Sequence, residues 1–448
     1  MAGGSWQSQN KTLPGVYINI KSAPATQASI GDRGVVAVAE PLSWGPVGKV
    51  LTIQAGEDVT SLLGYDVNTA PELLFLRQLF LGTNRTRGAK TVLYFRPAAA
   101  QAAQASADIG SGDNVLTVKA LYPGARGNDI SVSVAADPDG GAYTVQTAVS
   151  GAVADAQSVD RLDELRANQW VTFQGSGAPT AAAATPLTGG KDGTVSAPAY
   201  STFLSAIEPH RFDVVCYSGT DQVVQAAVAA FVKRLTEDEG RKCQAVMGGY
   251  DGADYEGVIS VRNGLVLPGR TLTAGESAWW AAGCTAGANY NESLTHASHP
   301  GAVDASPRMT TAEKAAAVRA GGFVLAEEDG AVRVVTDVNT LTTFTAEKGR
   351  SFSKNRVLRV LHTIANSIYA AFSKNYIGQA DNTSAGRDLL KKEIVGLLNE
   401  MQANGGVQEF TSDDVTVAPG ADSDAVVVEL AVKPVDAIEK IYMTVTVS

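Results

Sequence analysis

Alternating apolar and polar residues mark the two ends of this chain. Residues 441–448 read Ile-Tyr-Met-Thr-Val-Thr-Val-Ser, and residues 16–20 read Val-Tyr-Ile-Asn-Ile. Both have the period-two pattern of a strand with one apolar face. Terminal segments usually fray unless another element holds them. Each end therefore predicts an extended, strand-like arm that pairs with a sheet, either in the same molecule or in another copy.

Between these ends, short apolar runs alternate with segments of helical period. The helix expected at 221–239 carries Val224, Val228, Phe231 and Leu235 on one face. This alternation predicts an α/β domain over residues 23–97 and 196–345, with a partly parallel sheet covered by helices. Its strands are expected at 34–39, 91–95, 212–217, 243–247 and 258–267.

Residues 98–195 differ from the regions on either side. Short β-type runs are separated by turn sequences such as Pro123-Gly124 and Asp137-Pro138-Asp139-Gly140, and one short helix is expected at 159–167. Linker-like stretches rich in Ala and Gly flank the segment. We interpret it as a small, mostly β domain inserted into the α/β domain.

The region 346–437 predicts a C-terminal α+β domain, with two helices on an antiparallel sheet. The first helix is expected at 354–376, with an apolar face from Val357 to Phe372. A second helix follows the N-cap candidates Asn382-Thr383-Ser384 and ends at Asn404-Gly405. Strands are expected at 407–417 and 425–433. Residues 1–22 and 438–448 are then the N-terminal arm and the C-terminal arm strand.

Composition narrows the class of protein. Of the 448 residues, 45% are hydrophobic and 18% are charged, against about 25% charged in typical soluble proteins. Such a surface suits a protein that neighbouring molecules partly cover, and it also suits an ordinary alanine-rich enzyme. The net charge of −10 argues against a nucleic-acid partner. The sequence shows no signal peptide and no apolar run long enough to span a membrane, which predicts synthesis in a cytoplasm without membrane insertion.

No set of residues has the spacing of a catalytic, cofactor or metal site. Gly190-Lys191 lacks the first glycine and the hydroxyl of a phosphate-binding loop, and no Gly-x-Ser-x-Gly motif occurs. His296 and His299 are three residues apart but have no third ligand nearby, so surface-loop histidines are the favoured interpretation. The three cysteines are widely spaced, which argues against a disulfide scaffold.

Several short motifs, in order along the chain, resemble the contractile phage tail sheath family, including the sheaths of phage-tail-like particles. They cover nearly the whole chain except 98–195. They are Leu13-Pro14-Gly15-Val16-Tyr17, Gly34-Val35-Val36-Ala37, Trp44-Gly45-Pro46, Leu267-Pro268-Gly269-Arg270, Ala278-Trp279-Trp280-Ala281-Ala282-Gly283 and Phe352-Ser353-Lys354-Asn355-Arg356-Val357.

This resemblance implies a structural subunit, not an enzyme, without a cofactor. Such subunits polymerise as hexameric rings stacked helically around a tail tube, and contraction drives the tube through a target cell envelope. The implied partners are further copies of the chain, the tail tube protein, and baseplate and tail terminator proteins. The implied location is the tail of a virion or phage-tail-like particle, assembled in the bacterial cytoplasm. A cytoplasmic α/β enzyme of unknown substrate and another tail component, such as a baseplate protein, remain as alternatives.

In the family, terminal arms add strands to the sheets of neighbouring subunits, and the inserted domain faces outward. The resemblance therefore places inter-subunit strands at Val16, Tyr17, Ile18, Asn19 and Ile20, and at Tyr442, Met443, Thr444, Val445, Thr446 and Val447. Basic residues of the terminal domain are candidates for the face toward the tube, and a plain solvated helix surface is an equal alternative. These residues are Arg356, Arg359, Lys391 and Lys392.

Overall fold

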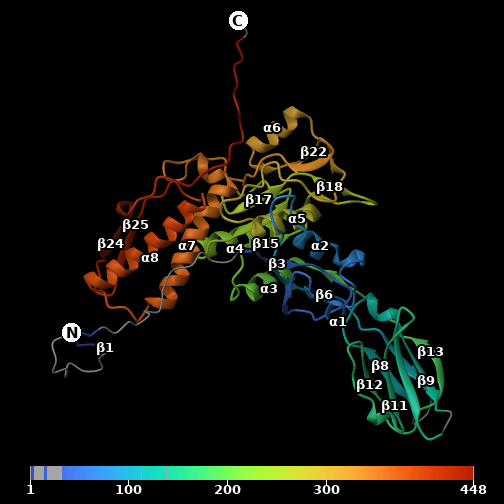
Figure 1. Ribbon diagram of the computed structural model, residues 1–448. Helices are drawn as coiled ribbons and strands as arrows, with labels where there is room; N and C mark the ends of the chain where they lie inside the picture. Colours follow the sequence, from blue (N-terminus) through green and yellow to red (C-terminus); the bar gives the residue numbers. More distant parts are fainter. Residues whose placement is uncertain (1, 5–14, 18–32, 112–113, 138–139, 447–448) are drawn as a thin grey trace. The chain divides into compact units, whose positions relative to one another are not determined.

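The structure is a computed structural model that describes residues 2–4, 15–17, 33–111, 114–137 and 140–446 (Figure 1). The chain forms two compact units, and each is described by itself. The larger unit consists of residues 32–362 and 435–448, and the smaller unit of residues 1–31 and 363–434.

A seven-stranded sheet lies at the centre of the larger unit. All its strands are parallel except β4, which pairs antiparallel with β5 at one edge. The partly parallel sheet predicted from the sequence is therefore confirmed. In spatial order the strands are β21 (Gly322–Phe323), β17 (Val258–Val261), β16 (Gln244–Gly248), β15 (Val214–Tyr217), β3 (Val35–Ala39), β5 (Thr91–Phe95) and β4 (Val50–Gln54).

Alternate residues of β3 face opposite sides of this sheet, as the period of a strand requires. Val36 and Val38 belong to one buried cluster, and Ala37 and Ala39 to another. The first cluster includes side chains of α2 and α5, and the second includes side chains of α3 and α4. Both faces are thus covered by helices. The helices are α2 (Leu74–Phe80), α5 (Ala274–Gly287), α3 (Ala197–Ile207) and α4 (Gln222–Glu237).

Helix α5 packs unusually close to its neighbours because of its small residues. The Thr273 hydroxyl accepts a hydrogen bond from the Glu276 backbone N–H, and the Glu276 carboxylate accepts one from the Thr273 backbone N–H, which fixes where the helix begins. A Cβ atom on Gly283 would lie only 2.0 Å from the carbonyl oxygen of Leu79. The glycine therefore lets the backbone of α5 touch the end of α2.

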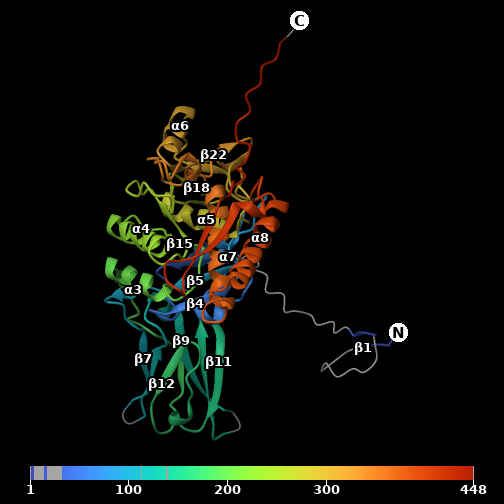
Figure 2. The same cartoon turned by 90° about the vertical axis from the view of Figure 1, so that its left-hand side faces the viewer.

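The inserted segment is a β-sandwich, so its predicted mostly β character is confirmed (Figure 2). Only a 3₁₀ turn, Leu162–Glu164, stands where a helix was expected at 159–167. One sheet has the order β11 (Ala152–Val159), β10 (Tyr143–Val149), β9 (Ile130–Ala136) and β13 (Ala182–Pro186). The other has the order β12 (Val171–Gln174), β8 (Leu116–Ala120) and β7 (Ser106–Ile109).

The β-sandwich is held firmly to the α/β domain. The two chain connections pair as strands β6 (Ala99–Ala100) and β14 (Thr194–Val195). Trp44 of the α/β domain packs against Tyr122 and Trp170 of the sandwich, with ring centroids 5.4 and 5.0 Å apart. The buried Arg96 guanidinium donates to the carbonyl oxygens of Gly45 and Pro123, each at 2.6 Å. The junction is therefore a packed interface, whereas the sequence suggested two linkers.

Smaller elements surround the sheet of the larger unit. They are the short helices α1 (Thr60–Leu63) and α6 (Thr311–Arg319), the sheet of β18 (Gly264–Leu267), β19 (Arg270–Thr271) and β20 (Asp304–Ser306), and the hairpin of β22 (Leu325–Glu328) and β23 (Ala331–Val334).

The smaller unit contains most of the first predicted helix, all of the second, and an antiparallel hairpin, whose first strand begins at Val415 and not at the predicted residue 407. Helix α7 (Asn355–Asn375) crosses the boundary between the units, at Thr363, and α8 (Ser384–Ala403) follows it. Thr383 caps α8, accepting a hydrogen bond from the Gly386 N–H at 3.2 Å, and its predicted apolar residues from Leu390 to Met401 are buried. The hairpin consists of β24 (Val415–Pro419) and β25 (Val426–Leu430).

Candidate functional site

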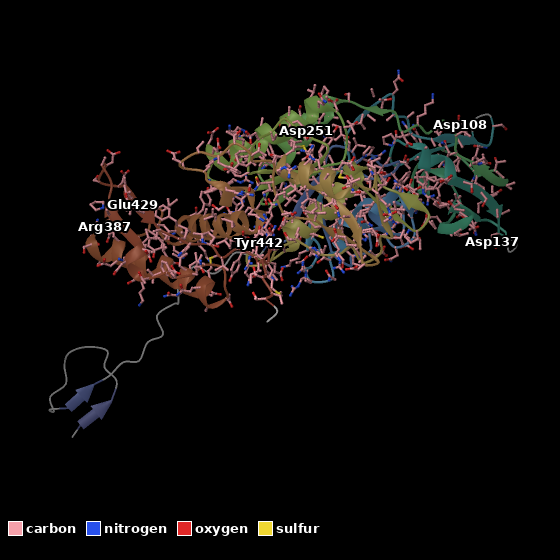
Figure 3. The ribbon with its side chains drawn as sticks, turned by 90° about the horizontal axis from the view of Figure 1, so that it is seen from above. Asp108, Asp137, Asp251, Arg387, Glu429 and Tyr442 are labelled. Atoms are coloured by element: carbon pink, nitrogen blue, oxygen red, sulfur yellow. The ribbon has the colours of Figure 1, made fainter. Side chains whose placement is uncertain are left out.

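The most exposed apolar segment of the described residues is the C-terminal one, and in Figure 1 this segment extends away from the fold toward the C-terminus. The side chains of Ile441, Met443 and Val445 are 80%, 77% and 75% exposed. Tyr442, labelled in Figure 3, is 91% exposed. No strand is assigned between residues 438 and 446. An apolar segment left in solvent in this way is typical of a surface that binds a partner.

The root of this segment is fixed at Glu439. Its carboxylate forms an ion pair with the ammonium of Lys354, and it accepts a hydrogen bond from the Thr295 hydroxyl at 2.7 Å. The Glu439 side chain is only 13% exposed. Glu439 is therefore a half-buried contact at the root of the segment, and the exposed residues follow it.

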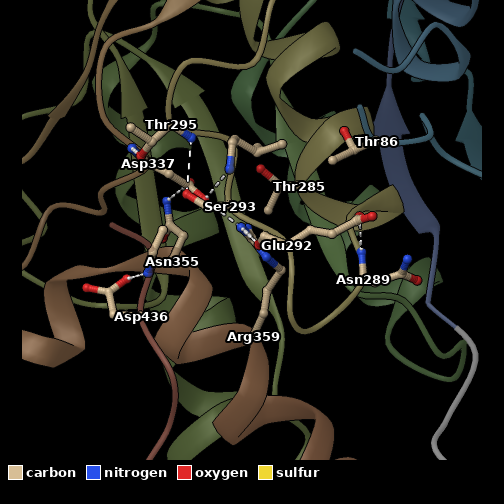
Figure 4. Close-up of polar contacts among 12 residues, drawn as sticks. Thr86, Thr285, Asn289, Glu292, Ser293, Thr295, Asp337, Asn355, Arg359 and Asp436 are labelled. Atoms are coloured by element: carbon tan, nitrogen blue, oxygen red, sulfur yellow. Dashed lines mark hydrogen bonds and ion pairs between the residues drawn. The ribbon is translucent and has the colours of Figure 1, made fainter. Parts of the chain in front are cut away.

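Behind this contact lies a buried polar network centred on Asp337 (Figure 4). Its carboxylate accepts from the Arg359 guanidinium at 2.5 Å, the Asn355 side-chain amide at 2.9 Å and the Leu294 backbone N–H at 3.0 Å. The Asp337 backbone N–H donates to the Thr295 hydroxyl at 2.9 Å. Arg359 and Asn355 come from the first turns of α7, so the network fixes the start of α7 to the loop after β23.

The hairpin β24–β25 offers an open strand edge. Ala431 N–H donates to Asp414 C=O and Gly420 N–H donates to Ala425 C=O, each at 2.9 Å. Hydrogen-bonded and non-hydrogen-bonded pairs alternate in an antiparallel ladder, so residues 426, 428 and 430 direct their backbone groups outward. Within the described residues, no other strand pairs with this edge of β25.

The opposite edge of the hairpin is less suited to pairing. Pro419 stands at an outward-facing position of β24, opposite Val426, and proline has no N–H to donate. On β25, Val427 and Val428 are 48% and 38% exposed. The edge of β25 therefore combines complete backbone donors with apolar side chains.

The predicted arm residues have different positions in the isolated chain. Val16 and Tyr17 lie in strand β2 (Gly15–Tyr17), which pairs parallel with β1 (Ala2–Gly4). Ile18, Asn19 and Ile20 lie outside the described residues, as does Val447. Tyr442, Met443, Thr444, Val445 and Thr446 have no strand partner in the described chain. Their pairing with a neighbouring subunit stays a prediction.

Among the four basic candidates, Arg359 does not lie on an exposed face, so its prediction is wrong. Its side chain is fully buried and paired with Asp337, so it does not belong to an exposed face. Arg356 is half-buried, and burial lowers the pKa of its guanidinium. Lys391 is half-buried and Lys392 is exposed. Helical spacing places Arg356 and Arg359 near each other but does not show which one points inward.

His299 also differs from its expected surface position. It is buried, with its Nε2 atom 2.9 Å from the Gln78 side-chain oxygen and its Nδ1 atom accepting from the N–H groups of Gly301 and Ala302. Burial lowers the pKa of His299 to about 4. His296 is exposed. Over the residues that the structure describes, no group of His, Cys, Asp and Glu is arranged to hold a metal ion.

Several buried acids were not predicted from the sequence, among them Asp337 and Glu40, and Glu40 directly follows β3. One carboxylate oxygen accepts from the Ser218 hydroxyl and from the Trp279 indole N–H, both at 2.6 Å. Burial raises the pKa of Glu40 to about 7. A signal existed in the sequence, since a carboxylate that ends a buried strand of a parallel sheet lies at the edge where polar groups gather.

None of the helices in the described ranges combines the length and apolar character needed to cross a membrane. The cysteines Cys216, Cys243 and Cys284 are all buried free thiols, and burial raises the pKa of Cys243 to about 12.

Comparison with known proteins gives the family. The model of the Gp18 domain III N-terminal region matches residues 33–96, and that of the phage tail sheath beta-sandwich domain matches 98–192. The models of the phage tail sheath central domain and C-terminal domain match 193–340 and 347–448. Together they cover nearly all of the chain from residue 33 onward.

Individual relatives agree. A solved sheath tail protein from Desulfitobacterium hafniense is 43% identical, with a TM-score of 0.85 over 96% of this chain and 99% of that one. The phage-like element PBSX protein XkdK of Bacillus subtilis (strain 168) is 34% identical over 100% of both chains. The helical sheath of the anti-feeding prophage in its contracted state, 14% identical, shares the fold with a TM-score of 0.59 over 97% of this chain and 99% of that one. The chain belongs to the phage tail sheath protein family, whose members are structural proteins of contractile tails and injection particles and not enzymes.

Proposed function

We propose that this sheath subunit polymerises as hexameric rings stacked helically around a tail tube, and that contraction of the stack drives the tube through a target cell envelope. The observation that supports this most directly is the exposed C-terminal segment from Ile441 to Val445, whose apolar side chains have no core of their own. The shared fold with a sheath whose contracted state has been solved also supports it.

The link between subunits is strand addition. The arm residues Tyr442 to Val447 of one copy pair with the outward edge of β25 in another copy, where Val426, Val428 and Leu430 offer three N–H and three C=O groups. About six backbone hydrogen bonds at roughly 1 kcal/mol each give a link of several kcal/mol, before side-chain burial. The N-terminal residues Val16 to Ile20 form a second link of the same kind.

Contraction needs links that survive rotation of the subunits. A strand pairing is held by backbone hydrogen bonds, and the single chain that leads to it can turn without breaking them. The subunits therefore rotate to a shorter and wider state while the arms stay paired. The inserted β-sandwich faces outward, and the sheath subunits contact the tail tube, the baseplate and the tail terminator.

The face toward the tube includes the exposed Lys392 and the half-buried Arg356 and Lys391. Contacts of exposed charges are individually weak and sensitive to salt. Such contacts hold the extended sheath on the tube and break when the sheath widens. The particle, phage or phage-tail-like, is assembled in the bacterial cytoplasm.

Electron microscopy of the purified protein tests the proposal. The full chain should form hollow tubes or stacked rings, and a chain without residues 441–448 should stay folded but unpolymerised. A chain without residues 1–20 should lose polymerisation too. Monomers without rings under all salt conditions would contradict the sheath assembly, whereas normal tubes from either truncated chain would contradict the arm exchange alone.

A further inference from the structure

The C-terminal arm begins in the larger unit, although the hairpin that precedes it belongs to the smaller unit. The smaller unit ends at Pro434, and residues from Val435 onward belong to the unit that contains the seven-stranded sheet. Ile438 is 89% exposed and Ile441 is 80% exposed. Between these two exposed residues, Glu439 is held by its side chain, and each of its two carboxylate oxygens has a partner.

The two partners of Glu439 are themselves firmly placed. Lys354 immediately precedes α7, and its backbone forms a β-bridge with Val338. The Thr295 hydroxyl accepts from the Asp337 N–H, so its own proton is free to be donated to the Glu439 carboxylate. Thr295 therefore connects Glu439 directly to the buried Asp337–Arg359 network.

We infer that Glu439 is a positioning residue that pins the root of the C-terminal arm to the α/β domain and places the pivot of the arm at Lys440. This inference rests on the proposed strand exchange, because a pivot matters only if the arm reaches another subunit. The pin makes the arm leave at a fixed point and follow the α/β domain when that domain turns. Without it, the free chain would begin at Val435.

The charge and burial of the contact suit this role. An ion pair shielded from water is stronger than an exposed one, and it is joined here by a charge-assisted hydrogen bond from an uncharged hydroxyl. Lys354 and Glu439 are 21% and 13% exposed, whereas the pair Lys433–Glu409 is 60% and 71% exposed. The Lys433–Glu409 pair is therefore a matched control, because the same two charges are exposed there and should contribute little to holding the chain in place.

Spin labels measure the pin in the unpolymerised chain. The three native cysteines are buried, so a label attaches to one cysteine introduced at position 438 or 443, both of which are exposed. We expect the label at 438 to be several times less mobile than the label at 443. Glu439→Gln or Lys354→Met should raise the mobility at 438 to that at 443, and Glu409→Gln should leave it unchanged.

Equal mobility at both positions in the parent chain would overturn the inference, as would no change at 438 in both Glu439→Gln and Lys354→Met. This readout does not depend on polymerisation, so its failure is distinct from failure of the proposed function. In polymers, Glu439→Gln should still form tubes, because the arm strand is intact, but with weaker helical order in their diffraction. Tubes of unchanged order would show that the pin does not position the arm.

Discussion

At the scale of single residues, the larger unit contains two buried carboxylates with different kinds of partner. Asp337 is paired with the Arg359 guanidinium and accepts further hydrogen bonds from Leu294 and Asn355. Glu40 has only neutral donors, Ser218 and Trp279, and burial raises its pKa to about 7. The first should stabilise the fold through its charge, and the second should weaken it when charged.

Replacing Asp337 with Asn should destabilise the larger unit by about 3–5 kcal/mol, because the Arg359 charge is left buried without its partner. Urea unfolding followed by tryptophan fluorescence measures this loss. Arg308→Met is the control, since Arg308 pairs with Asp304 from an exposed position and its loss should change the stability far less. Equal losses from both substitutions would contradict the structural role of the network.

Glu40→Gln should remove a pH dependence of stability. A folded pKa of about 7, raised from 4.5, means that the protonated form is preferred in the folded chain. The stability that Glu40 contributes is therefore fully present below pH 4.5 and lost as the pH rises through 7, up to about 3 kcal/mol.

The difference in unfolding free energy between Glu40→Gln and the parent should be near zero at pH 4.5 and should favour the variant above pH 7. His299 has the opposite effect, because the stability that it contributes is lost as the pH falls from 6.5 toward about 4. This effect is the same in the variant and the parent, so it cancels in the difference. A difference that stays constant with pH would show that Glu40 is not preferentially protonated in the fold.

Single residues were the hardest to place from sequence. Arg359 and Arg356 lie on the same helix three positions apart, and only the position of Asp337, contributed by a distant loop, makes one of them buried. The sequence predicts a surface-loop histidine at His299, because its partner Gln78 is 221 positions away and leaves no local signal. Burial of a polar side chain depends on such distant partners, which local patterns do not contain.

At the scale of elements, the hairpin β24–β25 has two edges of different character. Val427 and Val428 are both exposed valines whose backbone groups point in opposite directions. Val427 is in a hydrogen-bonded pair with Ala418, and Val428 faces outward. Proline is tolerated in an edge strand where its missing N–H would face away from the ladder.

Val428→Pro should therefore leave the hairpin folded and prevent tube formation, because it removes an outward donor from the receiving edge. Circular dichroism should remain like that of the parent, while electron microscopy should show no tubes. Val427→Pro is the control that breaks the hairpin itself and should lower the melting temperature. Normal tubes from Val428→Pro would exclude the outer edge of β25 as the site of strand addition.

Elements with strong periodicity were predicted well. Helix α4 was expected at 221–239 and lies at Gln222–Glu237, and the apolar residues of α8 are buried as predicted. The strand expected at 438–447 is not formed in the described part of that segment, since a strand needs a partner and none is present in the single chain. The alternating pattern indicates that the segment can form a strand, and a partner strand is needed for it to do so.

At the scale of the whole molecule, the inserted β-sandwich and the α/β domain share one buried cluster, which runs through Trp44 and Trp170. Trp44→Ala should cost about 3–5 kcal/mol and should uncouple the two domains, so that calorimetry shows a separate transition for each. Phe203→Ala, buried on the other face of the sheet, should lower stability while leaving them coupled. A separate sandwich transition in the parent chain would contradict this coupling.

The inserted domain was recognisable in the sequence from its change of composition and its turn motifs. Its rigid attachment was not, because Trp44, Arg96, Tyr122 and Trp170 come together only after both domains fold. Gly124 is a further example, since a Cβ atom there would lie 2.0 Å from the carbonyl oxygen of Ser43. Sequence patterns indicated the parts of the molecule, and their junctions required the structure.

Pro419 bears on how many neighbours one hairpin can recruit. Two equally open edges would let strands add on both sides, and subunits would then branch or stack into fibrils. Pro419 removes one donor from the edge of β24, so the edge of β25 is the better one for strand addition. Under the proposed strand exchange, each hairpin accepts one arm at the edge of β25. Strand addition therefore ends when each of these edges is paired, and the polymer keeps a fixed stoichiometry.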